Sequence, residues 1–165
     1  MYSIIAMVVC VVFSGYFSAT ETAFTSLNRI RMKNMANDGN KRAREVMELS
    51  DNYDNLLSTI LVGNNIVNIA LSSIATVFFM GLYPTYGATI ATAVATIVVL
   101  IFGEISPKGL AKEHPEKFAM FSAPFIGILT VLLTPVNWVF AQWKKVLAKV
   151  FNADGVRPIT EEELL

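Results

Sequence analysis

Cysteine and histidine are almost absent: the 165 residues include one of each, Cys10 and His114. A single cysteine excludes a disulfide within the chain, and the spacing typical of zinc, copper or iron–sulfur sites does not occur. Any metal held by one chain should therefore be a hard cation with oxygen ligands. The sequence also lacks a nucleophile–base pair, a phosphate-binding loop and a cofactor motif, so we expect neither an enzyme nor a nucleic-acid partner.

Charge is sparse as well. Only 16% of the residues are charged and 54% are hydrophobic, whereas an average soluble domain is about 25% charged. The mean hydropathy is +0.52. Charged residues occur in short stretches between long uncharged runs, which is typical of membrane proteins. The first run has no basic residues before it and no clear cleavage site, so we interpret it as part of the mature chain.

Three apolar runs, each with at most one charged residue, are long enough to cross a bilayer as helices, at about 1.5 Å per residue. They cover about residues 1–27, 56–80 and 88–106. Basic residues follow the first and third runs, so the positive-inside rule predicts an outside N-terminus and a cytoplasmic segment from residue 29. Within that segment, residues 37–40 (NDGN) predict a turn between two short helices. We expect a cytoplasmic helical hairpin whose basic side chains either contact anionic headgroups or are solvated.

A fourth apolar run, at about residues 118–143, is also long enough to span. Lysines flank both of its ends, which favours the cytoplasm for both. Pro124 and Pro135 each remove a helix hydrogen bond, and Trp138 and Trp143 favour the interface. We predict a bent belt helix at the inner leaflet, with a true fourth span as the alternative. The expected fold is all-α and integral to the membrane, with three transmembrane helices, the hairpin and this juxtamembrane belt.

Polar side chains interrupt the first run at membrane depth. Ser14 and Ser18 are four residues apart and share one helix face, and Glu21 follows on roughly the same side. Serine hydroxyls in membrane helices often bond back to their own backbone, which makes packing one interpretation and a ligand role the other. Glu21 is expected near the inner interface, as a structural group or as a neighbour of a site.

Three asparagines, Asn64, Asn65 and Asn68, lie within five residues of the second run. Each is costly at membrane depth unless it finds a partner. Hydrogen bonds between helices are one solution. A cation site is the other, because amide oxygens are good ligands for hard cations. The presence of a carboxylate elsewhere at membrane depth favours the cation site.

That carboxylate belongs to Glu104, at the end of the third run. Pro107 has no N–H, so in an α-helix it cannot bond the carbonyl of Gly103, four residues back. A freed carbonyl beside an acid is a recurrent cation site in broken membrane helices. Alternatively, Glu104 pairs with Lys108 at i+4; the two interpretations combine if Lys108 occupies the site once the ion has left. The oxygen ligands suit Mg²⁺, Ca²⁺ or Na⁺.

Residues 17–23 (FSATETA), 63–68 (GNNIVN) and 103–108 (GEISPK) together resemble the transmembrane domain of the CorC/CNNM magnesium transporter family. The resemblance implies a homodimer in the cell membrane that exports Mg²⁺, in exchange for Na⁺. The ion site carried over by motif comprises Ser18, Asn64, Asn68, Gly103 and Glu104. Its second tier comprises Ser14, Asn65, Glu21, Pro107 and Lys108. Which of the adjacent asparagines faces the ion is open, because one residue turns a side chain by about 100°.

The transport domain is expected over residues 1–150, and residues 151–165 are expected to begin a linker. The ending RPITEEE resembles the family's linker into a cytoplasmic CBS pair, and Thr160 looks like a helix N-cap at a domain boundary. Besides lipid, the expected partners are a second copy and that regulatory domain. Two other functions stay open: a membrane sensor that binds Mg²⁺ without transporting it, and a membrane anchor whose polar residues only hold the dimer together.

Overall fold

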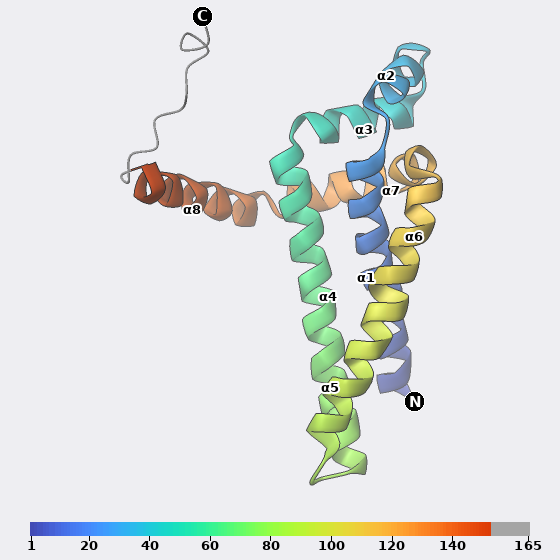
Figure 1. Ribbon diagram of the computed structural model, residues 1–165, viewed down its shortest axis with the longest axis vertical. Coiled ribbons are helices and arrows are strands. Elements are labelled where there is room, and N and C mark those ends of the chain that lie inside the picture. Colours follow the sequence, from blue (N-terminus) through green and yellow to red (C-terminus); the bar gives the residue numbers. More distant parts are fainter. Residues whose placement is uncertain (153–165) are drawn as a thin grey trace, which may run out of the picture.

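The structure is a computed structural model that describes residues 1–152, with side chains through residue 147. All elements of this part are helical (Figure 1), which confirms the all-α expectation. In chain order they are α1 (Tyr2–Ser26), α2 (Arg29–Asn37), α3 (Lys41–Asp51), α4 (Tyr53–Leu82), α5 (Gly87–Val98), the π-helix η1 (Val99–Ile105), α6 (Ser106–Glu113), α7 (Pro115–Leu132) and α8 (Thr134–Asn152). The predicted linker beyond residue 152, with Thr160, lies outside the described residues.

Three long rods form the bundle: α1, α4 and the continuous run α5–η1–α6 (Figure 1). α4 runs antiparallel to the other two. Large apolar side chains face outward, such as Ile69 and Val77, which are 67% and 75% exposed. Hydroxyl side chains such as Ser14, Thr20 and Thr59 are buried inside. This arrangement suits a bilayer, where small and polar residues make the contacts between helices.

The third rod is not broken at Pro107, which corrects the sequence-based expectation. Its helix continues to Glu113, and Pro107 lies in the first turn of α6. The turns before the proline widen into the π-helix η1, in which the Ser106 N–H donates to the carbonyl of Ile101, five residues back. Such an insertion lets a helix pass a residue that cannot donate.

The predicted belt is two helices rather than one bent helix, because the chain leaves helical geometry at Leu133, between α7 and α8. Both lie crosswise to the bundle (Figure 1). Within the described residues, α1, α4, α5–η1–α6 and α7 are each long and apolar enough to cross a membrane. Two polar contacts hold α8 to α4: the Asn137 amide donates to Thr59 Oγ1 over 3.0 Å, and Lys144 pairs with Asp54 at 3.2 Å.

α2 and α3 pack against each other beside the end of the bundle (Figure 1). The predicted turn between them contains Gly39, whose φ of +94° favours glycine. Asn28 and Asn40 cap the two helix N-termini through their side-chain oxygens. Met32 of α2 and Val46 of α3 are fully buried in a core that they share with α7. The short helices and α7 therefore form one packed layer.

Candidate cation site

Glycines let the three rods approach one another closely. A Cβ at Gly63 on α4 would lie 2.6 Å from the ring of Phe17 on α1. A Cβ at Gly103 on η1 would lie 2.7 Å from Ser14 Oγ. Real Cβ contacts are not this short, so neither position accepts a larger side chain without a shift of its neighbour. The two glycines bring α4 and η1 against the same two turns of α1.

A polar network crosses this contact. Ser14 Oγ donates to Asn64 Oδ1 over 3.2 Å, from α1 to α4. The Asn68 amide nitrogen donates to the same Asn64 oxygen over 3.4 Å. Asn64 Oδ1 thus accepts two hydrogen bonds, whereas Asn68 Oδ1 is buried with no partner. Asn65 is exposed on the outer side of α4, so the structure places Asn64 and Asn68 inside the bundle and Asn65 outside it.

Ser18 Oγ is also buried without a partner. Neighbouring hydroxyls on α1 bond back to the carbonyl four residues earlier. Thr20 donates to the Tyr16 carbonyl over 2.7 Å, and Thr22 donates to the Ser18 carbonyl over 3.1 Å. The Ser18 hydroxyl does not bond back in this way. Among the described residues, the buried side-chain atoms without a partner are Ser18 Oγ, Asn68 Oδ1 and Asn137 Oδ1. An unsatisfied buried polar group costs about 1–3 kcal/mol.

The Ser18 and Asn68 side chains lean toward the same level of the bundle. Side chains on a helix tilt toward its N-terminus. α1 and α4 are antiparallel (Figure 1), so by this rule Ser18 tilts toward Ser14 and Asn68 tilts toward Asn64 from the other direction. The two residues with unpartnered oxygens therefore flank the Ser14–Asn64 hydrogen bond, one helical turn to either side. We call Ser14, Ser18, Asn64, Asn68 and Gly103 the polar cluster.

The π-helix adds Phe102 to the residues whose backbone carbonyl lacks its usual donor. The Ser106 N–H bonds to Ile101 and Pro107 has no N–H, so the Phe102 carbonyl receives neither the i+4 nor the i+5 hydrogen bond. Its oxygen faces α1, 3.1 Å from the position that a Cβ on Gly15 would take. Pro107 equally cannot donate to Gly103, four residues back, whose carbonyl the sequence predicted to be released. Phe102 is a further site residue, which the sequence did not indicate.

The charged residues of the predicted site and of its second tier also have definite places. Glu104 is partly buried on η1. Lys108 Nζ lies 3.2 Å from Glu21 Oε2, so the ion pair joins α6 to α1. Within residues 1–147, the alternative pairing of Lys108 with Glu104 is not formed.

The polar cluster can ligate only through oxygen. Its side chains provide hydroxyl and amide oxygens, the backbone adds the Phe102 carbonyl, and Glu104 is the carboxylate on the same π-helix. The described residues contain no group of three or more histidine, cysteine, aspartate or glutamate side chains that could hold a metal. Hydroxyl, amide, carbonyl and carboxylate oxygens suit a hard cation such as Mg²⁺, Ca²⁺ or Na⁺.

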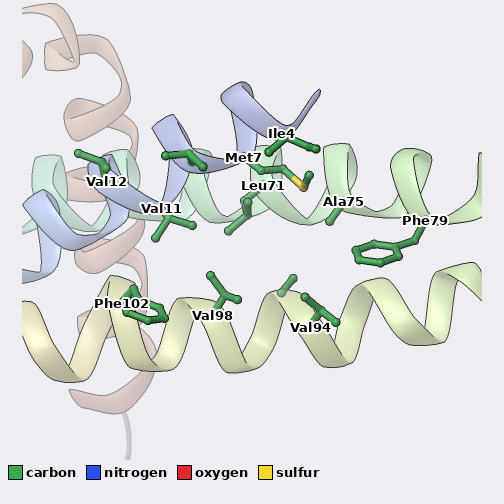
Figure 2. A pocket seen from close by; sticks show the side chains of 12 residues that line it. Ile4, Met7, Val11, Val12, Leu71, Ala75, Phe79, Val94, Val98 and Phe102 are labelled. Atoms are coloured by element: carbon green, nitrogen blue, oxygen red, sulfur yellow. The ribbon is translucent and has the colours of Figure 1, made fainter. Parts of the chain in front are cut away.

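An apolar cleft lies next to the polar cluster, toward the N-terminus of α1. Figure 2 shows the side chains that line this space of about 540 Å³ between α1, α4 and α5–η1. They are Ile4, Met7, Val8, Val11, Val12, Leu71, Ala75, Phe79, Val94, Ala95, Val98 and Phe102. No oxygen or nitrogen belongs to any of these side chains. The same three rods thus enclose oxygen ligands at one level and hydrocarbon at the next.

Comparisons with known proteins give a consistent result. The family described as "Cyclin M transmembrane N-terminal domain" matches residues 5–165. A UPF0053 protein of Haemophilus influenzae is 41% identical over 146 residues, which cover 88% of this chain and 35% of that protein. The UPF0053 inner membrane protein YfjD of Escherichia coli is 41% identical over 139 residues, covering 84% and 32%. The chain spans about a third of the length of these two relatives.

Proposed function

Because this chain belongs to the CNNM family and is a multi-pass membrane protein, we propose that it is the transport domain of a secondary transporter that exports Mg²⁺. The family assignment confirms the resemblance seen in the three sequence motifs. Na⁺ entry is the proposed driving force. A second copy of the chain and a cytoplasmic CBS-type domain are the proposed partners, with membrane lipid around the bundle.

The pair of unpartnered oxygens, Ser18 Oγ and Asn68 Oδ1, carries this proposal. A bundle keeps such groups only at a cost, and a cation would satisfy both. The proposed ligands are Ser18, Asn64, Asn68, Gly103 and Glu104, with the Phe102 carbonyl added. They come from three separate helices, so a small movement of one helix changes the ligand number. Mg²⁺ demands near-octahedral coordination, and such a change would release it.

We further propose that three rods cross the membrane, with the N-terminus outside and the C-terminus in the cytoplasm. The crosswise direction of α7 and α8 supports a belt over a fourth span (Figure 1). α7 also packs against the charged helix α3, which belongs outside the hydrocarbon layer, as well as against α1. The lysines at both ends of the α7–α8 region agree with this topology.

Mg²⁺ flux in proteoliposomes, with and without an opposing Na⁺ gradient, tests the function. We expect flux that the Na⁺ gradient accelerates and that Glu104→Gln abolishes. Asn65→Ala is the matched control, because Asn65 is exposed next to the buried network. Mg²⁺ binding without flux under any gradient would establish the sensor instead. Absence of both binding and flux would leave the membrane anchor.

A further inference from the structure

The two ends of the polar cluster differ in what they offer a hydrated cation. Toward the N-terminus of α1 lies the apolar cleft, whose lining side chains are hydrocarbon (Figure 2). Toward the end of the bundle that carries α2 lies the ion pair of Glu21 and Lys108. Hydrocarbon walls expel water and oppose the passage of ions. Only the end with the ion pair presents groups that can replace water around a cation.

The ion pair lies about one helical turn beyond the polar cluster, on the side of α2. Glu21 is three residues beyond Ser18 on α1, and Lys108 is four residues beyond Glu104 in the third rod. Each partner is therefore about one helical turn past a proposed ligand on its own helix. The Lys108 and Glu21 side chains are 40% and 31% exposed, so they reach the surface, whereas Ser18 beneath them is 1% exposed.

We propose that the Glu21–Lys108 pair is the lid of the cation entrance, which runs between α1 and α6. With the lid closed, the Lys108 ammonium pairs with the Glu21 carboxylate, and the two side chains cover Ser18. An arriving cation competes with the ammonium for that carboxylate. Lys108 then swings away, and the cation passes from Glu21 to Ser18 and Glu104. This proposal rests on the proposed function for the identity of the ion, but the lid itself is a property of the two side chains.

The strength of the pair suits a lid. An ion pair that is partly exposed contributes little to stability, because water competes for both partners. It therefore opens on its own often enough to admit a cation. A fully buried pair would hold the entrance shut, because its partners could not separate without leaving a charge unpaired.

Thiol accessibility tests the lid without requiring transport. Cys10 is the only native cysteine, so Cys10→Ala gives a background in which Ser18→Cys is the sole thiol. Membrane vesicles of each orientation are treated with a positively charged, membrane-impermeant methanethiosulfonate. We expect slow modification of the Ser18→Cys thiol, from the face of the membrane that carries α2 and α3. Adding Lys108→Met or Glu21→Gln should raise the modification rate of this thiol about fivefold. This factor corresponds to the free energy lost with a partly exposed ion pair.

Lys108→Arg should restore the slow rate, because it keeps the charge and the reach of the lid. Thr25→Cys is the matched control: Thr25 is already exposed on α1 beyond the lid, so its rate should not respond to Lys108→Met. If Ser18→Cys does not fold, Ser14→Cys reports on the same space. An unchanged rate with Lys108→Met and Glu21→Gln, or faster reaction from the opposite face, overturns the lid. Failure of Mg²⁺ flux with an intact labelling pattern would overturn the proposed function alone.

Discussion

The polar cluster and the apolar cleft are built by the same three rods and have opposite chemistry. In the polar cluster, glycines bring the rods together until Ser14 Oγ meets Asn64 and the backbone of η1. In the cleft, which begins within one helical turn of the polar cluster, valine, isoleucine and phenylalanine side chains keep the same rods apart (Figure 2). Side-chain size sets the distance between helices, and that distance decides whether oxygens from different helices can meet.

The difference also shows where function has overridden stability. Hydrocarbon in the cleft costs nothing in a bilayer, because acyl chains are equally apolar. Ser18 Oγ and Asn68 Oδ1 are buried without partners, at about 1–3 kcal/mol each. Unsatisfied groups of this kind persist at sites where a ligand satisfies them. Substitutions that make the polar cluster more apolar, or the apolar cleft more polar, therefore test this difference.

The largest effect is expected when the polar cluster is made apolar. Asn68→Leu removes a proposed ligand together with an unpartnered amide oxygen. Mg²⁺ flux should fall below detection, while the free energy of unfolding of the ion-free protein stays equal or rises by about 1–3 kcal/mol. Proteoliposome flux and thermal unfolding measure the two quantities. Asn65→Leu, on the exposed side, is the control, and wild-type flux in Asn68→Leu would remove Asn68 from the site.

Separating the rods at the polar cluster should have the next largest effect. Gly103→Ala places a methyl group 2.7 Å from Ser14 Oγ. We expect the free energy of unfolding to fall by about 1–3 kcal/mol, as for other overpacked interiors. Thermal unfolding in detergent measures the loss. Gly109→Ala is the matched control in the same rod, since its Cβ would meet no atom within 4 Å; an equal loss there would mean that helix approach is not what Gly103 provides.

Restoring the backbone donor should have a smaller effect. Pro107→Ala supplies an N–H that can bond the Phe102 carbonyl, which removes that oxygen from the site without touching a side-chain ligand. Mg²⁺ affinity should fall by up to about tenfold, the equivalent of one net hydrogen bond. Titration of Mg²⁺ binding to the purified protein measures it. Unchanged affinity would show that the carbonyl is not a ligand.

The smallest effect is expected in the cleft. Val98→Thr introduces a hydroxyl of nearly the same shape into the cleft, and this hydroxyl can bond back to its own helix. Mg²⁺ flux should stay within about twofold of the wild type, because the exchange removes no proposed ligand and the new hydroxyl is satisfied by its own helix. The same flux assay is used. A loss as severe as that of Asn68→Leu would mean that the cleft belongs to the ion pathway.

The sequence predicted the polar cluster because spacing alone places Ser14 with Ser18, and Asn64 with Asn68, on single helix faces. It could not choose between Asn64 and Asn65, because that choice depends on how α4 is rotated against α1. It predicted a released carbonyl at Gly103 but not the one at Phe102, because nothing in the sequence indicates the change from α to π geometry. The pairing of Lys108 with Glu21 across two helices was missed because the i+4 partner, Glu104, was closer in sequence.

Local sequence signals were sufficient to predict the features of the fold that depend on neighbouring residues alone. The turn at Gly39 follows from an Asp-Gly pair between helix-forming segments. A bend in the α7–α8 region was predicted from its prolines, but its position at Leu133 was not, because Pro135 indicates an interruption without fixing its place. The crosswise direction of α7 goes with its packing against α1 and α3, which no local pattern encodes.

The central claim is that the unpartnered oxygens of the polar cluster bind Mg²⁺. The most direct test is the thermal unfolding of the purified protein during a Mg²⁺ titration, compared with Asn68→Leu. A ligand at 100 times its dissociation constant stabilises the folded state by about 2.7 kcal/mol. We predict that the unfolding temperature of the wild type rises with Mg²⁺ and that of Asn68→Leu does not. No rise in the wild type, or the same rise in both proteins, would contradict the claim.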